Sequence, residues 1–351
     1  MSDNIMFLVL IIVAVVGIFF GLSGNNSALG ISNGNGLFAS VFAAAETNWS
    51  DGVGQFLVSY DDFKNIHKAV LNKNNDIKVF DIDGYPKENL MYASTDQGLF
   101  ISRDGGLTWN SFTSSNYEIN ASSIIFKILP ASSNGEDYFI SVFSGGRGVV
   151  YRTYDYFFHL EKLIDFDNEA VYDMYQQGNS LYLAVSNGQI IHLNLKNGQS
   201  RVVNVFSSPV LKIYKPNGLG FYLLFKSGNI GKSQSLEGKF EKINLPGGGF
   251  FSSPKVSLLQ FDSNGIMYVL NEEGIFKSLD GGGNYSLMKE IPIQKKTIDA
   301  MGLNNGKIYV VSDKKMFTSS DGGKNWKIDD LGNSFKISSF YFVNQRIIMS
   351  M

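Results

Sequence analysis

The chain repeats a short phrase in which a hydroxyl side chain stands two residues before an aspartate. The pattern is Ser-x-Asp-x-Gly-x-(Thr/Asn)-aromatic, and its clear copies are 102–109, 278–285 and 319–326. Two carboxylates that face one cleft could act as the acid and base of a glycosidase. An acidic loop could also bind calcium, but such a loop needs several oxygen ligands and a distal Glu, which no copy contains. The sequence therefore does not predict a calcium site.

The same residue types are those of a tight turn between two short strands. A Ser hydroxyl and an Asp carboxylate can accept hydrogen bonds from backbone N–H groups inside the turn. Glycine at the fifth position permits a positive φ, and the closing aromatic residue can bury its ring between neighbouring sheets. We therefore interpret the phrase as structural. Its predicted structural residues are Ser102, Asp104, Gly106, Trp109, Ser278, Asp280, Gly282, Tyr285, Ser319, Asp321, Gly323 and Trp326.

Weaker copies fill the gaps between the clear ones. The fair copies begin at Ser59 (with Asp61) and at Thr153 (with Asp155), and the eroded ones are 194–201 and 233–240. Seven starts separated by 39 to 51 residues indicate stacked or radial repeats.

One repeat contains four short strands, which are the parts of a propeller blade. In the last complete repeat we predict strands at 297–302, 307–311, 316–319 and from 326 onward, and the first two are joined by a hairpin signal, Asn304-Asn305-Gly306. Segment 336–351 reads as the first two strands of a blade and segment 53–70 as the last two. The sequence predicts an all-β, seven-bladed β-propeller over 51–351, closed by pairing its N- and C-terminal strands.

The N-terminal segment predicts a membrane anchor or a signal helix. Residues 6–22 carry no charged side chain and are just long enough to span a bilayer. The positive flank typical of a signal peptide is absent, which favours an uncleaved anchor over 1–22, followed by a flexible linker over 23–50. We expect a single-pass protein of the cell membrane with the propeller outside the cytoplasm, or a secreted protein if the segment is cleaved.

The phrase resembles the Asp-box of the BNR/sortilin-type repeat. That repeat occurs in sialidases, sortilin-like receptors, some glycoside hydrolases and the photosystem II stability/assembly factor family. The clear copies match it at every defining position, and the degenerate copies extend the resemblance over nearly the whole chain after residue 50. The resemblance implies a propeller in which the box marks the fold and lies away from the ligand face.

A search for catalytic groups favours a protein without enzymatic activity. A sialidase needs an arginine triad, and the five arginines are poorly placed for one: Arg103, Arg147, Arg152, Arg201 and Arg346. Carboxylates on the turns opposite the boxes, which a glycosidase could use, are Asp96, Glu272, Glu273 and Asp313. The histidines His67, His159 and His192 lack metal-ligand spacing. We predict no catalytic residue, metal or cofactor.

The expected function is a membrane-tethered scaffold that binds proteins, membrane complexes among them, as the photosystem II assembly factors imply. The alternative is a carbohydrate-binding or glycosidase-like protein on the same fold. The net charge of −2 makes nucleic acid a poor partner. On the face opposite the boxes, Arg147 between glycines is the first candidate contact, together with Lys226 and Lys314.

Overall fold

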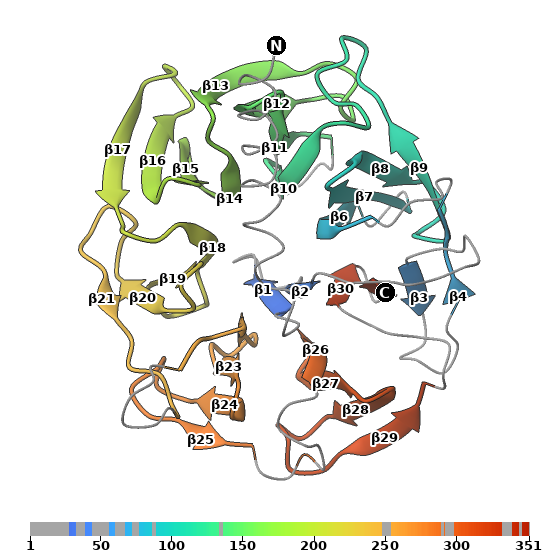
Figure 1. The fold of residues 1–351 in the computed structure, drawn as a ribbon, viewed down its shortest axis with the longest axis vertical. Helices are drawn as coiled ribbons and strands as arrows, with labels where there is room; N and C mark the ends of the chain where they lie inside the picture. The colour runs from blue at the N-terminus through green and yellow to red at the C-terminus, as the bar shows by residue number, and fades with distance from the viewer. Residues whose placement is uncertain are drawn as a thin grey trace, which may run out of the picture.

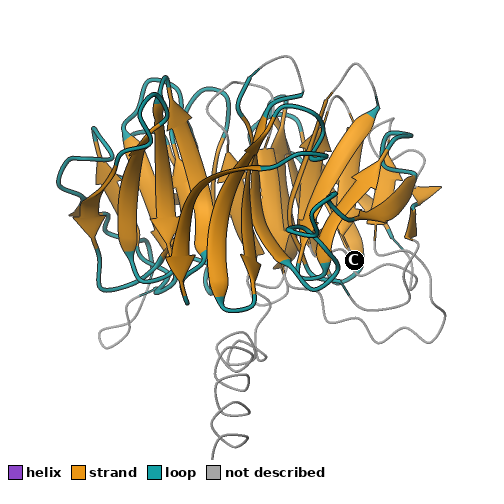
Figure 2. Cartoon of the chain, turned by 90° about the horizontal axis from the view of Figure 1, so that it is seen from above, coloured by secondary structure: helices purple, strands orange, loops and turns teal. Residues whose placement is uncertain are grey.

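The structure, a computed structural model, is a β-propeller whose blades surround a central axis (Figure 1). It describes residues 28–32, 39–43, 56–59, 67–71, 77–85, 89–132, 136–247, 254–288, 291, 298–331, 339–343 and 346–350. Seen from the side, the strands run between two faces, and turns gather on both (Figure 2).

Six blades are built from consecutive strands that pair antiparallel from the axis to the rim. The β6 blade contains β6 (Val79–Tyr85), β7 (Leu90–Thr95), β8 (Gly98–Ser102) and β9 (Thr108–Phe112), with β5 (Val70–Leu71) parallel to β9. The β10 blade contains β10 (Ile124–Pro130), β11 (Tyr138–Ser144), β12 (Arg147–Thr153) and β13 (Glu161–Asp167). The β14 blade contains β14 (Val171–Gln177), β15 (Ser180–Val185), β16 (Gln189–Asn194) and β17 (Ser200–Val205).

The other three blades follow the same order. The β18 blade contains β18 (Val210–Tyr214), β19 (Phe221–Phe225), β20 (Ile230–Ser233) and β21 (Glu241–Lys242). The β22 blade contains β22 (Leu258–Phe261), β23 (Met267–Asn271), β24 (Gly274–Ser278) and β25 (Ser286–Leu287). The β26 blade contains β26 (Ile298–Asn304), β27 (Lys307–Ser312), β28 (Lys315–Ser319) and β29 (Lys327–Asp330).

The strands from the two ends of the chain form one six-stranded sheet, which we call the composite sheet. It has six strands in the order β1-β2-β30-β31-β3-β4, and β31 pairs antiparallel with β3. The β1–β2 end of this sheet lies at the centre of the ring (Figure 1). The strands are β1 (Ala28–Ser32), β2 (Ala39–Ala43), β3 (Phe56–Ser59), β4 (His67–Lys68), β30 (Ser339–Val343) and β31 (Arg346–Ser350).

The prediction of a seven-bladed propeller is therefore wrong. Six blades are regular, and the terminal strands form a composite sheet because β1 and β2 extend it inward. The predicted linker 23–50 is interrupted by these two strands, which pair with each other over five residue pairs. The described residues contain strands and no helix, so none of their elements is a helix that could span a membrane. Segment 6–22 lies outside the described residues.

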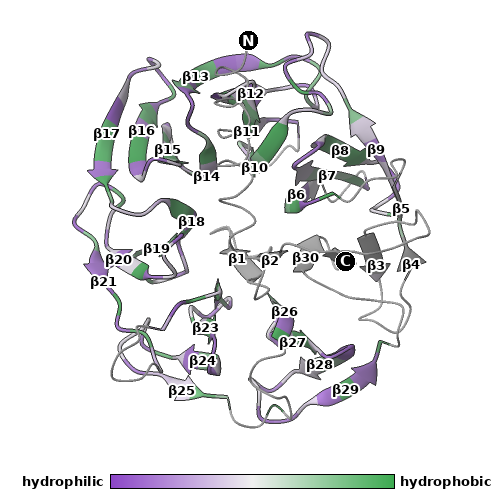
Figure 3. Cartoon of the chain, in the orientation of Figure 1, coloured by the Kyte–Doolittle hydropathy of each residue, from purple (hydrophilic) through white to green (hydrophobic). Residues whose placement is uncertain are grey.

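The core lies between adjacent blades. One cluster joins the β6 and β10 blades through buried side chains that include Tyr92, Ile125, Tyr138 and Phe157. Apolar residues concentrate in the inner and middle strands, whereas outer strands such as β21 are hydrophilic (Figure 3). Burial of these apolar side chains on both faces of each sheet is the main term that stabilises the ring.

Candidate functional site: an aromatic cleft on the rim

The clear copies of the phrase form hydrogen-bonded turns between the third and fourth strands of their blades. In the first copy, Ser102 Oγ donates to Asp104 Oδ1 at 2.8 Å and accepts from the Gly106 N–H at 2.8 Å. Asp104 also accepts from the Thr108 N–H and hydroxyl. The other two clear copies repeat these bonds through Ser278, Asp280, Gly282 and Asn284, and through Ser319, Asp321, Gly323 and Asn325.

The carboxylates of these turns accept hydrogen bonds from residues of the same turn. Hydrogen bonds from the Asn284 backbone and side chain hold the pKa of Asp280 well below its usual range, and Asn325 does the same for Asp321. Both aspartates therefore remain acceptors and are poorly suited to donate a proton as a general acid.

The closing aromatic residues belong to the same structural unit. Trp109 is fully buried, and its indole N–H donates to the Gly106 carbonyl at 2.9 Å. Trp326 makes the equivalent bond to the Gly323 carbonyl at 3.0 Å. Tyr285 packs against the cluster of the β18 and β22 blades.

The fair copies differ in how much of them is described. Ser59 is buried at the end of β3, and Asp61 lies outside the described residues. Thr153 and Asp155 form a turn like the clear ones, because Thr153 Oγ1 accepts from the Phe157 N–H at 3.0 Å and Asp155 Oδ1 accepts from the His159 N–H at 2.9 Å.

The three predicted contact residues lie on different blades. Arg147 begins β12, and its exposed guanidinium is paired with Asp165 at 2.5 Å and Asp167 at 3.6 Å. Lys226 follows β19 and Lys314 precedes β28; both are exposed. The structure therefore does not bring the three cations together, and the charge of Arg147 is already compensated.

The candidate acidic and metal-binding residues are also dispersed. Asp96, the Glu272–Glu273 pair and Asp313 belong to the β6, β22 and β26 blades. His159 and His192 lie in the β10 and β14 blades, and His67 lies in the composite sheet. Among the described residues, no group of three His, Asp or Glu side chains could hold a metal ion.

The turn at 153–160 has features that the sequence analysis missed. Tyr156 and Phe157 stand where the first clear copy has Gly105 and Gly106, and both adopt the left-handed conformation, with φ of 59° and 71°. Non-glycine residues are strained there and persist when their surroundings hold them. Phe157 is fully buried, with its ring 4.8 Å from Tyr92 between ring centroids. The departure from glycine was visible in the sequence as a run of aromatic residues.

The same turn exposes aromatic side chains at the rim of the disc. Tyr154 is 52% exposed and Phe158 is 50% exposed. Phe158 packs edge-on against Phe112, at the end of β9, with 5.9 Å between ring centroids. Ser115 donates a hydrogen bond to the Phe158 carbonyl at 2.9 Å, which ties the loop after β9 to this turn.

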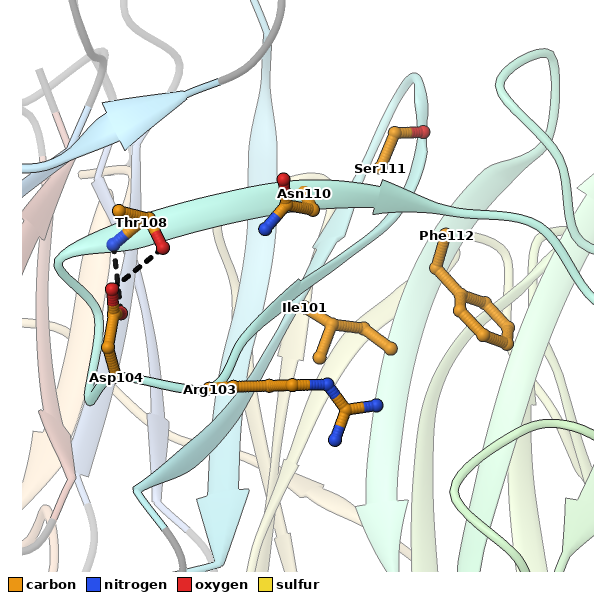
Figure 4. A pocket seen from close by; sticks show the side chains of 7 residues that line it. All are labelled: Ile101, Arg103, Asp104, Thr108, Asn110, Ser111 and Phe112. Atoms are coloured by element: carbon orange, nitrogen blue, oxygen red, sulfur yellow. Dashed lines mark hydrogen bonds between the residues drawn. The ribbon is translucent and has the colours of Figure 1, made fainter.

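A cleft of about 260 Å³ lies beside the Phe112 ring, against β8 and β9. In Figure 4 the side chains of Arg103 and Phe112 point to the same side of β9, and Asp104 is bonded to Thr108. Arg103 is exposed and has no ion pair with any described residue. The lining residues, which we call the rim cleft, are Ile101, Arg103, Asp104, Thr108, Asn110, Ser111 and Phe112.

A second unusual region is a row of buried charges on four neighbouring inner strands. Asp81, Lys127, Asp173 and Lys212 each follow a bulge in strands β6, β10, β14 and β18. Lys127 Nζ lies 2.7 Å from Asp81 Oδ2, and the Ile213 N–H donates to Asp173 Oδ2 at 2.7 Å. Desolvation lowers the pKa of Lys212 to about 8, opposed by Asp173. These four side chains are at most 5% exposed, so the row belongs to the core.

Comparisons with known proteins identify the fold. Neither a protein-family profile nor a curated protein matches the chain. A solved structure described as YCF48 bound to D1 peptide is similar, with 12% identity and a TM-score of 0.59, covering 78% of this chain and 91% of that one. The extracellular domain of a putative one-component system from B. thetaiotaomicron is 17% identical, with a TM-score of 0.59 over 83% of this chain and 40% of that chain.

A glycoside hydrolase is among the similar structures as well. The Niastella koreensis GH74 enzyme is 13% identical, with a TM-score of 0.50 over 71% of this chain and 45% of that chain. At such identities the similarity shows the propeller fold alone. Because that fold is found in a peptide complex and in a hydrolase, it does not decide whether this protein is an enzyme.

Proposed function

We propose that the protein is a non-enzymatic scaffold that binds other proteins through its propeller. The observation that carries the proposal is the exposed aromatic surface at the rim cleft, where Phe158 is half exposed and packs against Phe112 of the cleft lining. Aromatic and arginine side chains are enriched among the residues that dominate binding energy in protein interfaces. The similar structure of YCF48 with a D1 peptide supports the choice of a peptide or protein ligand.

We further propose that the repeated phrase is an Asp-box and that segment 6–22 tethers the propeller to a membrane, outside the cytoplasm. The match of the clear copies to the box and the uncharged composition of segment 6–22 support these two statements. Protease added to intact cells should digest the propeller if the proposed orientation is right, whereas protection from protease would contradict it.

Affinity purification of the full chain from detergent-solubilised native membranes tests the scaffold. We expect a protein partner at near-stoichiometric yield that is lost when Phe158 is replaced by Ser. The matched control is Leu279→Ser, because Leu279 is 75% exposed in the turn of another blade. Loss of the partner with the control as well, or no partner at all, would contradict binding through the rim.

A carbohydrate-binding function is the second candidate. Hydroxyl, amide and guanidinium groups line most of the rim cleft beside one aromatic ring, a composition that also suits a sugar. A glycan array probed with the purified chain separates the two candidates. Specific glycan binding without any protein partner would favour this candidate over the scaffold.

A further inference from the structure

We propose that the rim cleft binds an extended segment of a partner protein in which a carboxylate stands next to an apolar side chain. The carboxylate pairs with Arg103, and the apolar side chain packs against Phe112 and Phe158. This inference rests on the proposed scaffold function and adds the site and the chemistry of the segment it recognises.

The positive charge of Arg103 is the reason to expect a carboxylate in the bound segment. Its guanidinium is exposed and unpaired among the described residues, in contrast to Arg147, which has two carboxylates beside it. Asp104 lines the same cleft, but its oxygens already accept three hydrogen bonds from Ser102 and Thr108. A ligand carboxylate therefore provides the partner that Arg103 lacks, in the bidentate geometry that guanidinium groups favour.

The rings of Phe112 and Phe158 are the reason to expect an apolar side chain in the bound segment. The Ser115 hydrogen bond to its carbonyl orders the backbone of Phe158, and the edge-on contact with Phe112 positions its ring before a ligand arrives. A rigid aromatic surface loses little conformational entropy on binding. The next residue inward, Phe157, anchors the turn in the core between the β6 and β10 blades.

The volume of the cleft limits the ligand to one or two side chains. Its roughly 260 Å³ lies just below the range of about 300 to 1,000 Å³ that is usual for pockets of drug-sized ligands. The remaining affinity must come from contacts of the peptide outside the cleft.

The test uses a phage-displayed library of random dodecapeptides, selected on the purified full chain. We expect the enriched peptides to share an Asp or Glu, or a C-terminal carboxylate, adjacent to an apolar residue. A synthetic peptide of the enriched sequence is then titrated against variants by fluorescence anisotropy. Arg103→Gln and Phe158→Ser should each weaken binding roughly tenfold or more, and added salt should weaken binding to the parent chain more than to Arg103→Gln.

Two matched controls keep the result interpretable. Arg147→Gln removes an exposed arginine that is already ion-paired, and Leu279→Ser removes an exposed apolar side chain from the turn of another blade. Neither should change the affinity by more than about twofold.

Three outcomes would overturn the inference. Enriched peptides without an acidic group would overturn the charge preference, and equal affinity of Arg103→Gln and the parent chain would overturn the assigned contact. Capture of a membrane partner that is unaffected by Phe158→Ser would place the binding site elsewhere while leaving the scaffold function intact. Glycan binding with no protein partner would instead remove the scaffold function itself.

Discussion

The turns at 102–109 and 153–160 lie in neighbouring blades and form the same hydrogen bonds with different residues. In both, a buried hydroxyl accepts from the backbone N–H four residues later, at 2.8 Å in the first turn and 3.0 Å in the second. The left-handed positions hold two glycines in the first turn and Tyr156 and Phe157 in the second. The hydroxyl and the carboxylate therefore define the turn, and glycine is replaceable where a side chain finds a core to enter.

The comparison also separates structure from recognition. In the first turn Trp109 is buried and the Asp104 carboxylate accepts hydrogen bonds from within the turn. These side chains therefore stabilise the turn and are not available to a partner. The second turn directs one aromatic ring inward and leaves two others at the surface. Strain of this kind is commonly stored at functional sites, which is why the second turn is the better candidate for contact with a partner.

The largest expected effect is that of Phe157→Gly, which gives the second turn the residue of the first. Removing a buried phenylalanine costs about 3 to 5 kcal/mol, and relief of the left-handed strain returns about 1 kcal/mol. We expect a net loss of roughly 2 to 4 kcal/mol in the free energy of unfolding, measured by urea denaturation. Unchanged stability would mean that the aromatic cluster contributes nothing to holding the turn.

Gly323→Ala makes the reverse change in a clear copy and should cost about 2 kcal/mol. Gly323 has a φ of 90°, a conformation that L side chains rarely adopt, and an added Cβ would displace the terminal methyl of Met288. Gly178→Ala is the control, because Gly178 is also left-handed, with a φ of 59°, but has open space around it. Equal losses for the two variants in urea denaturation would show that the Met288 methyl is displaced without cost.

Ser278→Ala and Thr153→Val should each lower the free energy of unfolding by about 1 to 2 kcal/mol. Each removes a buried hydroxyl that accepts a backbone N–H, from Gly282 in one turn and Phe157 in the other. Similar losses, measured by thermal unfolding, would support one hydrogen-bond framework for both turns. A much smaller loss for Thr153→Val would instead assign the second turn to side-chain packing alone.

Tyr156→Gly should raise the free energy of unfolding by up to about 1 kcal/mol. Tyr156 is strained, only partly buried, and bonded through its hydroxyl to Glu136 at 3.3 Å. Tyr156→Ala serves as the control, since it removes the same side chain but keeps a Cβ in the left-handed region. If calorimetry finds the alanine variant as stable as the glycine variant, the strain at this position is negligible.

The smallest effect concerns pH. The hydrogen bonds of Asn284 place the folded-state pKa of Asp280 below its unfolded value, so its stabilising contribution is present near neutral pH and is lost as the pH falls through the acid range. Asp280→Asn should therefore show a smaller fall in melting temperature than the parent chain between about pH 6 and about pH 3. The effect is small because the carboxylate is exposed to water. An identical fall in both proteins would contradict the assignment.

Much of the fold could be predicted from the sequence because its signals are local. The Asn304-Asn305-Gly306 hairpin predicted strands at 297–302 and 307–311, and the structure has β26 at Ile298–Asn304 and β27 at Lys307–Ser312. The composite sheet could not be predicted in the same way. Its inner strands, β1 and β2, come from a glycine-containing segment that the sequence predicts to be a linker, and β2 pairs with β30 from the far end of the chain.

The candidate site was harder to predict because it depends on contacts between distant residues. Arg147 looked available from its flanking glycines, but strand pairing sets it opposite Asp167, twenty residues later. The repeated phrase did not predict the rim cleft, because its aromatic turn at 153–160 departs from the phrase. Tyr156 and Phe157 depart from it, and their exposed neighbour Phe158 meets Phe112 only after two blades have packed together.

The buried charge row has a consequence for how the ring assembles. Propeller blades are nearly interchangeable in shape, so a folding chain could dock the wrong blades or swap them with a second molecule. The signs of Asp81, Lys127, Asp173 and Lys212 alternate around four consecutive blades. A ring that skipped the β10 blade would set Asp81 against Asp173 and leave two buried carboxylates facing each other, which is strongly unfavourable. The alternation thus disfavours any blade order that places two of these aspartates or two of these lysines side by side.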